Sequence, residues 1–352
     1  MSTTSKYTRE DLAIMRAWPL ERKIQVTQTK ILEWYEYWGG QVYVSISGGK
    51  DSTVLLDLAR RVCPDIPAVF CDTGLEWPES RVFAMSQENV TRIYPIKYDF
   101  STKKYSRMTF KEVLDRYGYP VISKEVASLI RQYRSSKTDE QKQKLLDGNR
   151  WGMSKIPRRW YDLLYSDIPV SDQCCFAMKK YPFKVYERES GRKGIIGTTT
   201  EESLRRTTMW LRDGCNAFDA SHPISKPISF WTEQDILTYL KRFNIPYCSL
   251  YGDIVENEEG KLITTGLQRT GCMFCMFGVH LEGYPNRFQK MQVTHPKQWE
   301  YCMKPVEEHG LGLAKVLDFI GVDWKDYKEP TEEEKVNSIF GDNSDIDEDE
   351  FM

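Results

Sequence analysis

Two groups of residues in this sequence could do chemistry: a glycine-rich loop that carries a lysine, and four cysteines in two pairs. Paired glycines allow backbone N–H groups to turn toward one point, and the N-terminus of a following helix adds positive potential there. A lysine within the loop adds a full positive charge. We therefore predict an anion site suited to phosphate. The loop consists of Ser47, Gly48, Gly49, Lys50, Asp51 and Ser52.

The residues on either side of this loop predict a strand before it and a helix after it. Branched apolar residues alternate with others over residues 42–47, and apolar residues recur at helical spacing over residues 54–62. Ser52 or Thr53 would cap the helix. The loop is not a Walker A loop, which needs four residues between its first glycine and a Gly-Lys-Ser/Thr ending. The alternative is an ordinary turn with an incidental lysine, but the strand–loop–helix context favours the anion site.

The cysteines form a second candidate site. Cys174 and Cys175 are adjacent, and Cys272 and Cys275 form a C-x-x-C pair about a hundred residues further along the chain. Four thiolates suit a [4Fe–4S] cluster, and they also suit a structural zinc. A third reading is that they are unligated core cysteines, and spacing alone does not decide. We expect the remaining cysteines to be ordinary buried thiols: Cys63, Cys71, Cys215, Cys248 and Cys302.

The elements that must position these residues alternate along the chain. Alternating strands and helices predict an α/β fold, a doubly wound parallel sheet of Rossmann-like type with helical additions. Ligands in such folds bind beyond the carboxyl ends of the strands, so residues 47–52, 72–74 and 197–200 should gather there. We expect helices over residues 21–38, 80–89, 110–117, 182–189 and 232–243, and further strands over 68–71, 91–99 and 193–200.

The chain divides into four predicted parts. They are an N-terminal helical segment (1–40), an α/β domain (41–255), a C-x-x-C region (256–330) and an acidic tail (331–352). The tail holds nine acidic residues and one lysine, and we expect it to be disordered because it has little to bury.

A helical insert over residues 124–160 lies within the α/β domain and carries ten basic against four acidic residues. It is either a solvated helical hairpin or an arm that touches nucleic acid or an acidic partner.

Composition narrows the class of protein. No apolar run approaches the ~20 residues that a membrane span needs, and the N-terminus lacks a signal-peptide core. We therefore expect a cytoplasmic protein with no membrane partner. Nine cysteines in a reducing compartment favour metal or redox use over disulfides.

The loop sequence SGGKDS resembles the pyrophosphate loop (PP-loop) of the adenine-nucleotide α-hydrolases. That superfamily contains the N-type ATP pyrophosphatases and the PAPS/APS (sulfonucleotide) reductases. The stretch CDTGLEWPE that begins at Cys71 resembles a second motif of the reductase family. The resemblance implies that Asp72, Thr73 and Gly74 lie beside the nucleotide, with Asp72 contacting ribose or Mg²⁺ and Thr73 bonding the adenosine.

Two later stretches extend the resemblance. GTTTEESLRRTTMW, from Gly197, is similar to the family's phosphate segment. It implies that Gly197 lies at the nucleotide and that Arg205 and Arg206 make bidentate contacts to phosphate or sulfate, although one of the two arginines could simply form a surface ion pair. The stretch from residue 222 to residue 251 is similar to a structural part of the family, in which Trp231 and Tyr239 are core residues.

The cysteine pattern beside a PP-loop resembles APS reductase and the ATP pyrophosphatases of DNA sulfur modification (phosphorothioation), which carry a [4Fe–4S] cluster. The resemblance therefore favours the cluster over zinc, with the four paired cysteines as its ligands. It also implies that Lys179 offsets the negative charge of the cluster and could face the anionic end of the nucleotide.

Two departures from the reductases favour ATP as the substrate. The sequence lacks the E-C-G-x-H motif that carries their nucleophile, and its last cysteine, Cys302, lies in a different context. The loop SGGKDS is also intact, whereas reductases usually carry a degenerate one. We therefore expect an enzyme that converts ATP to AMP and pyrophosphate. Lys50 would stabilise the leaving group, and Asp51 or Asp72 would help to hold Mg²⁺.

In this reading the enzyme activates a nucleic-acid acceptor for sulfur insertion, with a cysteine desulfurase as sulfur donor. Three alternatives stay open: a PAPS/APS reductase, a tRNA thiolation enzyme, and a non-catalytic regulator that senses nucleotide or cluster and associates with DNA. A homo-oligomer also stays open.

Overall fold

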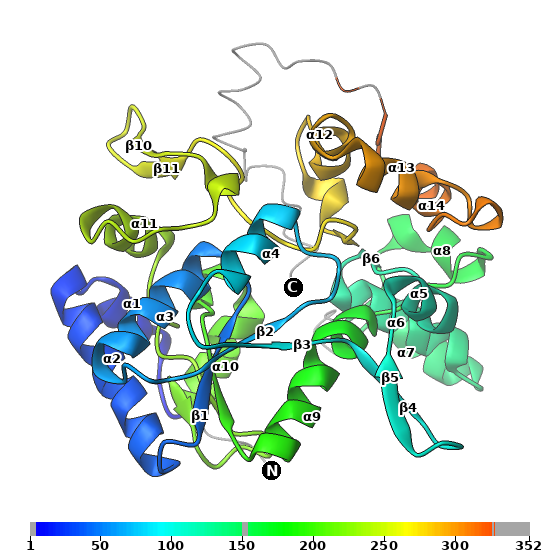
Figure 1. Cartoon of the computed structure of the whole chain (residues 1–352). Coiled ribbons are helices and arrows are strands. Elements are labelled where there is room, and N and C mark those ends of the chain that lie inside the picture. The colour runs from blue at the N-terminus through cyan, green and yellow to red at the C-terminus, as the bar shows by residue number, and fades with distance from the viewer. Residues whose placement is uncertain (1–4, 150–153, 326, 328–352) are drawn as a thin grey trace. The chain divides into compact units, whose positions relative to one another are not determined.

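A computed structural model describes residues 5–149, 154–325 and 327 (Figure 1). The chain forms two compact units, each built from two separate segments. The first unit comprises Met1–Pro95 and Tyr181–Gly271, and the second comprises Ile96–Lys180 and Cys272–Met352. The four-part division expected from the sequence stays a prediction.

A six-stranded, mainly parallel sheet forms the centre of the first unit, with strand order β3-β2-β1-β7-β9-β8. Only β8 runs antiparallel to its neighbour. Ile46 pairs with Phe70, and Ser45 pairs with Ile196, so β1, β2 and β7 end at the same edge. The predicted α/β class is confirmed. The strands are β1 (Val42–Ile46), β2 (Ala68–Cys71), β3 (Val90–Ile93), β7 (Lys193–Ile196), β8 (Asn216–Ala217) and β9 (Ile224–Ser225).

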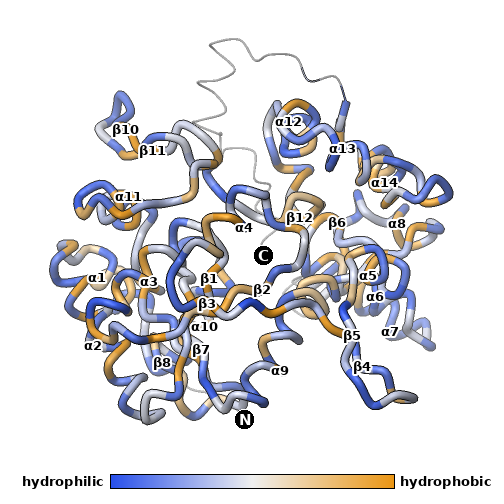
Figure 2. Tube along the Cα trace, in the orientation of Figure 1, coloured by the Kyte–Doolittle hydropathy of each residue, from blue (hydrophilic) through white to orange (hydrophobic). Residues whose placement is uncertain are grey.

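The side chains of β1 alternate between the two faces of this sheet, and packed residues cover each face. Val42, Val44 and Ile46 join the main apolar core together with residues of α2 (Leu20–Tyr37) and α3 (Lys50–Val62). Tyr43 points to the other face, where its ring stacks on Phe183 with centroids 5.9 Å apart. Figure 2 shows the apolar colouring along the central strands. The other helices of the unit are α1 (Arg9–Arg16), α4 (Pro78–Met85), α9 (Tyr181–Ser190), α10 (Leu204–Asp213) and α11 (Glu233–Arg242).

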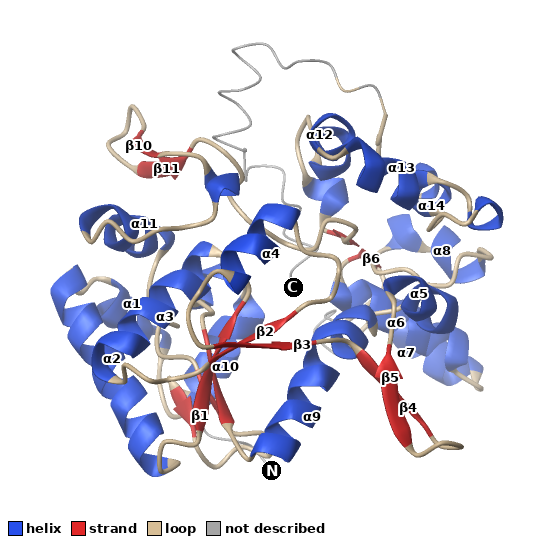
Figure 3. Cartoon of the chain, viewed as in Figure 1, coloured by secondary structure: helices blue, strands red, loops and turns tan. Residues whose placement is uncertain are grey.

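The second unit is mostly helical, as the blue and red colouring of Figure 3 shows. Its strands pair only in twos: β4 (Ile96–Asp99) with β5 (Lys104–Arg107), and β6 (Val121–Ile122) with β12 (Met276–Phe277). A further pair, β10 (Ile254–Glu256) and β11 (Leu262–Thr264), belongs to the first unit. The helices of the second unit are α5 (Phe110–Tyr117), α6 (Lys124–Ser135), α7 (Asp139–Asp147), α8 (Asp162–Tyr165), α12 (Arg287–Thr294), α13 (Pro296–Met303) and α14 (Leu313–Phe319).

Two local predictions are wrong. The strand expected over residues 91–99 is two strands, because Pro95 separates β3 of the main sheet from β4 of a separate hairpin. Proline has no N–H to donate to a ladder. The helix after the loop is capped not by Ser52 or Thr53 but by Gly49, and it begins at Lys50.

Most of the expected helices and the strand over 68–71 are confirmed within two to four residues at each end. Helices α6 and α7 bear out the helical part of the basic insert, but residues 150–153 of the insert and the whole predicted tail lie outside the described residues. Within the described ranges, no helix is both long and apolar enough to cross a membrane.

Two arginines of the basic insert form hydrogen bonds with other residues of the second unit. Arg131 Nε donates to Asp172 at 2.8 Å, and Arg134 Nη1 donates to the carbonyl oxygen of Ile168 at 2.6 Å. These arginines hold the insert to its own unit, so the surface charge is smaller than the composition indicates.

Candidate functional site

The predicted PP-loop, residues 47–52, leaves β1 and enters α3. Gly48 has a φ of +77°, and a Cβ there would lie 2.3 Å from the carbonyl oxygen of Ser80, so only glycine fits. Ser52 closes the loop, because its Oγ donates to the Gly49 carbonyl at 2.9 Å and accepts the Ser47 N–H at 3.2 Å. The N-terminus of α3 therefore lies at the carboxyl edge of the sheet.

Lys50 is the charge of this loop, and its side chain is buried. Its Nζ donates to the carbonyl oxygen of Gln268 at 2.9 Å and lies 3.1 Å from Glu233 Oε1. Its backbone N–H donates to Tyr251 Oη at 3.1 Å, and that hydroxyl lies 2.8 Å from Thr270 Oγ1. Residues 268–270 thus contact the loop directly, and a bound phosphate would have to replace the contacts that Lys50 makes now.

The sequence analysis did not identify these contacts as part of the site. Tyr251 lies in a stretch that it treated as structural, and residues 268–270 carry no motif of their own. The available signal was position: they immediately precede Gly271 and the C-x-x-C pair that begins at Cys272.

The two predicted arginines of α10 have different environments. Arg206 is partly buried, and burial lowers the pKa of its guanidinium; Asp51 and Arg269 are among its charged neighbours. It also pairs with Glu202. Arg205 is exposed. The structure therefore brings Arg206, but not Arg205, to the PP-loop, together with Arg269, which the sequence analysis did not single out.

Asp51 and Gly197 complete this part of the site. Burial raises the pKa of Asp51, while the positive charges of Lys50 and Arg269 act in the opposite direction. A Cβ at Gly197 would lie 3.0 Å from the Asp51 carbonyl oxygen, so glycine lets the end of β7 approach the loop closely. This contact confirms that residues 47–52 and 197–200 gather at one edge.

The third predicted segment follows β2 at the same edge. Asp72 is buried, and its Oδ2 accepts from Arg92 Nε at 2.7 Å and lies 3.0 Å from Arg81 Nη2. The Gly74 N–H donates to Asp72 Oδ1 at 3.2 Å, and Thr73 is buried beside it. Because two guanidinium groups already neutralise this carboxylate, Asp72 would have to exchange them in order to hold Mg²⁺.

The four paired cysteines all lie in the second unit. Cys174 and Cys175 precede a π-helical turn (η2, Phe176–Lys180) that packs on α5. Cys272 and Cys275 precede β12, whose Phe277 pairs with Ile122 of β6. Two segments that are far apart in the sequence are thereby held in one compact unit.

The thiols of these cysteines interact with one another. Burial raises the pKa of Cys174, and negative charge on the other three adds to the effect, whereas Lys179 opposes it. Burial also raises the pKa of Cys275 to about 11, with Cys272 and Cys175 contributing. Among the described residues, no three or more His, Cys, Asp or Glu side chains form a ready metal-binding group. Ligation would therefore have to draw these sulfurs closer together.

A residue that the sequence analysis missed stands beside the C-x-x-C pair. Arg287, at the start of α12, is largely buried, and its Nη1 donates to the Cys275 carbonyl at 3.0 Å. Burial alone would lower its pKa, but the carboxylate of Glu282 raises it, and negative charge on Cys275 and Cys272 adds to that rise. Its charge would help to balance an anionic metal centre. The five other cysteines are buried, as predicted.

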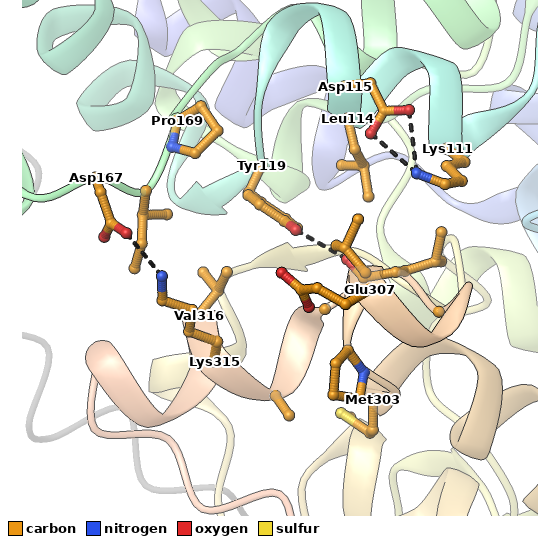
Figure 4. A pocket seen from close by; sticks show the side chains of 17 residues that line it. Lys111, Leu114, Asp115, Tyr119, Asp167, Pro169, Met303, Glu307, Lys315 and Val316 are labelled. Carbon is orange, nitrogen blue, oxygen red and sulfur yellow. Dashed lines mark hydrogen bonds and ion pairs between the residues drawn. The ribbon is translucent and has the colours of Figure 1, made fainter.

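A cavity of about 420 Å³ lies elsewhere in the second unit, between α5 and α14 (Figure 4). Tyr119 Oη donates to the Leu311 carbonyl at 2.9 Å across it, and Lys315 pairs with Asp167 at 2.8 Å at its rim. None of the predicted site residues lines this cavity. This cavity and the chemistry-bearing residues are therefore in different places.

Comparison with known proteins places the chain among sulfur-related nucleotide enzymes. The family model described as phosphoadenosine phosphosulfate reductase domain matches residues 41–276. Adenosine 5'-phosphosulfate reductases of Staphylococcus haemolyticus and Lysinibacillus sphaericus are each 24% identical, over 227 and 226 residues. These matches cover 63% of this chain and 70% and 73% of the two reductases.

An uncharacterized protein of Methanocaldococcus jannaschii is 23% identical over 290 residues, which is 82% of this chain and 53% of that protein. The chain thus spans about half the length of this relative.

Two solved structures have weak overall similarity. A phosphoadenylyl-sulfate reductase from Candida auris, in a phosphate complex, is 13% identical with a TM-score of 0.35, over 73% of this chain and 98% of that one. The U34-tRNA thiolase NcsA from Methanococcus maripaludis, with its [4Fe–4S] cluster, is 14% identical with a TM-score of 0.31, over 88% and 84%. TM-scores this low support no functional conclusion.

Proposed function

Since this chain belongs to the phosphoadenosine phosphosulfate reductase domain family of PP-loop enzymes, we propose that it is an ATP pyrophosphatase that adenylates an acceptor for sulfur transfer. The observation that carries the proposal is the intact loop at residues 47–52, with Lys50 at the N-terminus of α3 and Arg206 nearby. An acceptor oxygen attacks the α-phosphorus of ATP, the bond to the β-phosphate oxygen breaks, and pyrophosphate leaves with that electron pair.

The residues of the loop have distinct roles in this proposal. Backbone N–H groups in the first turn of α3 bind the pyrophosphate, and the Lys50 ammonium stabilises the charge that develops on it. Arg206 and Arg269 contact the remaining phosphate oxygens. Asp51, or Asp72 after exchange of its arginines, would help to hold Mg²⁺, which would supply positive charge to the phosphates. Before ATP binds, the ammonium group of Lys50 donates to the Gln268 carbonyl and pairs with Glu233.

We propose that Cys174, Cys175, Cys272 and Cys275 hold a [4Fe–4S] cluster. The donor set fits, because four thiolates in one unit are the usual ligands of such a cluster, although they would also fit zinc. Lys179 and Arg287 reduce the cost of gathering negative charge at this place. When bound, the cluster would supply a site for sulfur or for electrons in the transfer step.

The acceptor and the sulfur donor belong to the same proposal. We propose a nucleic-acid acceptor and a cysteine desulfurase as donor. The sulfur nucleophile would then displace AMP from the adenylated acceptor, so that the overall reaction consumes one ATP and yields AMP and pyrophosphate.

Pyrophosphate release from Mg-ATP by anaerobically purified protein tests the enzyme. Removing the ammonium in Lys50→Ala should lower release by roughly a hundredfold or more, since single groups that stabilise a leaving anion have effects of that size. Lys241→Ala, which removes a half-exposed lysine of α11, is the matched control and should release pyrophosphate as the parent does. Equal rates in the parent and Lys50→Ala, with or without added nucleic acid, would contradict the proposal.

A second candidate function is reduction of adenosine 5'-phosphosulfate, which two relatives bear in their names. Such a reaction needs a reactive thiol. Cys302, the last cysteine of the sequence, is fully buried, its Sγ lies 3.3 Å from the Trp299 carbonyl, and burial raises its pKa. A buried thiol of high pKa is a poor nucleophile. Sulfite release from adenosine 5'-phosphosulfate in the presence of thioredoxin would favour this second function.

A further inference from the structure

The hairpin of β4 and β5, residues 96–107, forms a two-stranded arm of the second unit (Figure 1). Tyr98 pairs with Tyr105 and Asp99 with Lys104 across it. Within the described chain, each strand packs chiefly on the other and makes no comparable contact with another element. An isolated two-stranded hairpin is marginally stable in water, so the side chains that hold this one in shape are informative.

The turn of the arm is organised by Asp99. Its Oδ1 accepts from the Ser101 N–H at 2.8 Å and from Ser101 Oγ at 2.6 Å. These hydrogen bonds hold the pKa of Asp99 at about 2. Asp99 is the single acidic residue of the twelve in the arm, and its carboxylate is directed into its own turn. The arm therefore has a defined tip, and its acidic group is already satisfied.

The base of the arm is anchored to α5. Lys97 pairs with Glu112, and Glu112 also caps α5, accepting from the Thr109 N–H at 2.7 Å. These interactions, above all the one with Lys97, hold the pKa of Glu112 at about 2. The base is thus fixed while the tip extends into solvent.

One face of the arm carries exposed aromatic rings. Alternation along the strands places Tyr98 and Tyr105 on the same side, with Arg107 beside them. The two tyrosine rings lie 5.1 Å apart, and Phe100 at the tip lies 5.1 Å from Tyr98. Phe100 is 85% exposed. A phenylalanine that an ordered turn holds out in water buries little apolar surface for the fold, which points to a partner.

The charge of the arm indicates what that partner is. Four basic residues stand against Asp99 in residues 96–107. Lys103 and Lys104 are exposed, and their ammonium groups make no hydrogen bond or ion pair with the described residues. Bases of a single strand stack on aromatic rings, while lysine and arginine contact its phosphates. In a duplex the faces of the bases are not accessible.

We propose that the β4–β5 arm binds single-stranded nucleic acid, with Phe100 and Tyr105 stacking on bases and with Lys103, Lys104 and Arg107 contacting phosphates. This inference rests on the proposed function and deepens it. It names the class of acceptor and the surface of the chain that would bind that acceptor. The binding itself requires neither ATP nor the cluster.

The molecule contains a matched control in the β10–β11 hairpin. That hairpin is also antiparallel and two-stranded, and its residues 254–264 hold three acidic residues, one lysine and no aromatic ring. Its lysine, Lys261, pairs with Glu259 at 2.8 Å. A nucleic acid has no stacking surface there, so Lys261→Ala should leave binding unchanged.

The experiment is fluorescence anisotropy of labelled single-stranded DNA and RNA oligonucleotides with the full chain, without ATP, over a range of salt concentrations. Phe100→Ala should weaken binding by roughly tenfold, the usual effect of one stacked base. The double variant Lys103→Ala/Lys104→Ala should reduce the slope of log affinity against log salt by about 1.4, for two phosphate contacts on a single strand. Thermal melting of each variant checks that the fold is intact.

Several outcomes would overturn the inference. They are no binding of any oligonucleotide by the parent chain, binding that Phe100→Ala and the double lysine variant leave unchanged, equal affinity for a duplex, or stronger binding of an acidic peptide than of the oligonucleotide. If pyrophosphate release persists while binding is absent, the acceptor inference fails alone; if binding persists without pyrophosphate release, the proposed enzyme fails alone.

Discussion

The PP-loop and the paired cysteines are two candidate sites built in opposite ways. The loop is six consecutive residues that run from the end of β1 into the first turn of α3, and its Lys50 already interacts with Gln268 and Glu233. The cysteines come from two segments, and their thiols oppose one another's ionisation. A site of the first kind can stay folded without its ligand, whereas a site of the second kind gains from a cation that neutralises it.

Replacing one of the four paired cysteines should cause the largest change, in iron content and in thermal stability. Cys275→Ser takes one of four thiolates from the proposed cluster, so we expect loss of iron and of the iron–sulfur absorbance, together with lower thermal stability. Cys63→Ser, at the end of α3 in the other unit, is the control and should keep its iron. Iron analysis and visible absorbance measure the bound iron of both variants. A full iron content in Cys275→Ser would show that the two regions do not differ as described.

Replacing the two arginines of α10 in turn compares a residue near the PP-loop with an exposed residue on the same helix. Arg206→Ala removes the partly buried guanidinium near Asp51, and we expect pyrophosphate release to fall by roughly ten- to a hundredfold, as for a lost charged contact to phosphate. Arg205→Ala changes an exposed residue on the same helix and should stay within about twofold of the parent. Equal losses in both variants would mean that α10 lies differently in the working enzyme.

The smallest expected effect is a change of stability with pH that arises in the cysteine-bearing unit. Burial lowers the pKa of His280 to about 4, from an ordinary value of 6.5. The folded state then binds fewer protons than the unfolded state between those values, so stability is full above pH 6.5 and declines as the pH falls toward 4. Linkage alone gives a loss of about 2 kcal/mol by pH 5, and because the ring is only partly buried we expect roughly 1 kcal/mol.

Urea unfolding of the parent chain and of His280→Gln, at neutral and mildly acidic pH, measures this loss. The variant should lose less stability than the parent on acidification. An equal loss in both chains would assign the pH dependence to other groups.

Much of the loop site could be predicted because its determinants are local. Alternation over residues 42–46 specifies β1, helical spacing specifies α3, and two glycines between them allow the turn. The two local errors have local explanations as well. Pro95 was a visible strand breaker that the strand prediction overran, and the cap prediction passed over Gly49 as a residue that can itself begin a helix.

The sequence by itself determined the chemistry available: a lysine in a glycine loop, two arginines, and four thiols in two pairs. Only the tertiary structure decided which of these meet. It turned Arg206 and not Arg205 toward Asp51, brought Tyr251 and residues 268–270 onto Lys50, and placed Arg287 beside Cys275. These partners are separated from the groups they contact by as much as two hundred residues, and such pairings follow from burial and strand register, which no local pattern encodes.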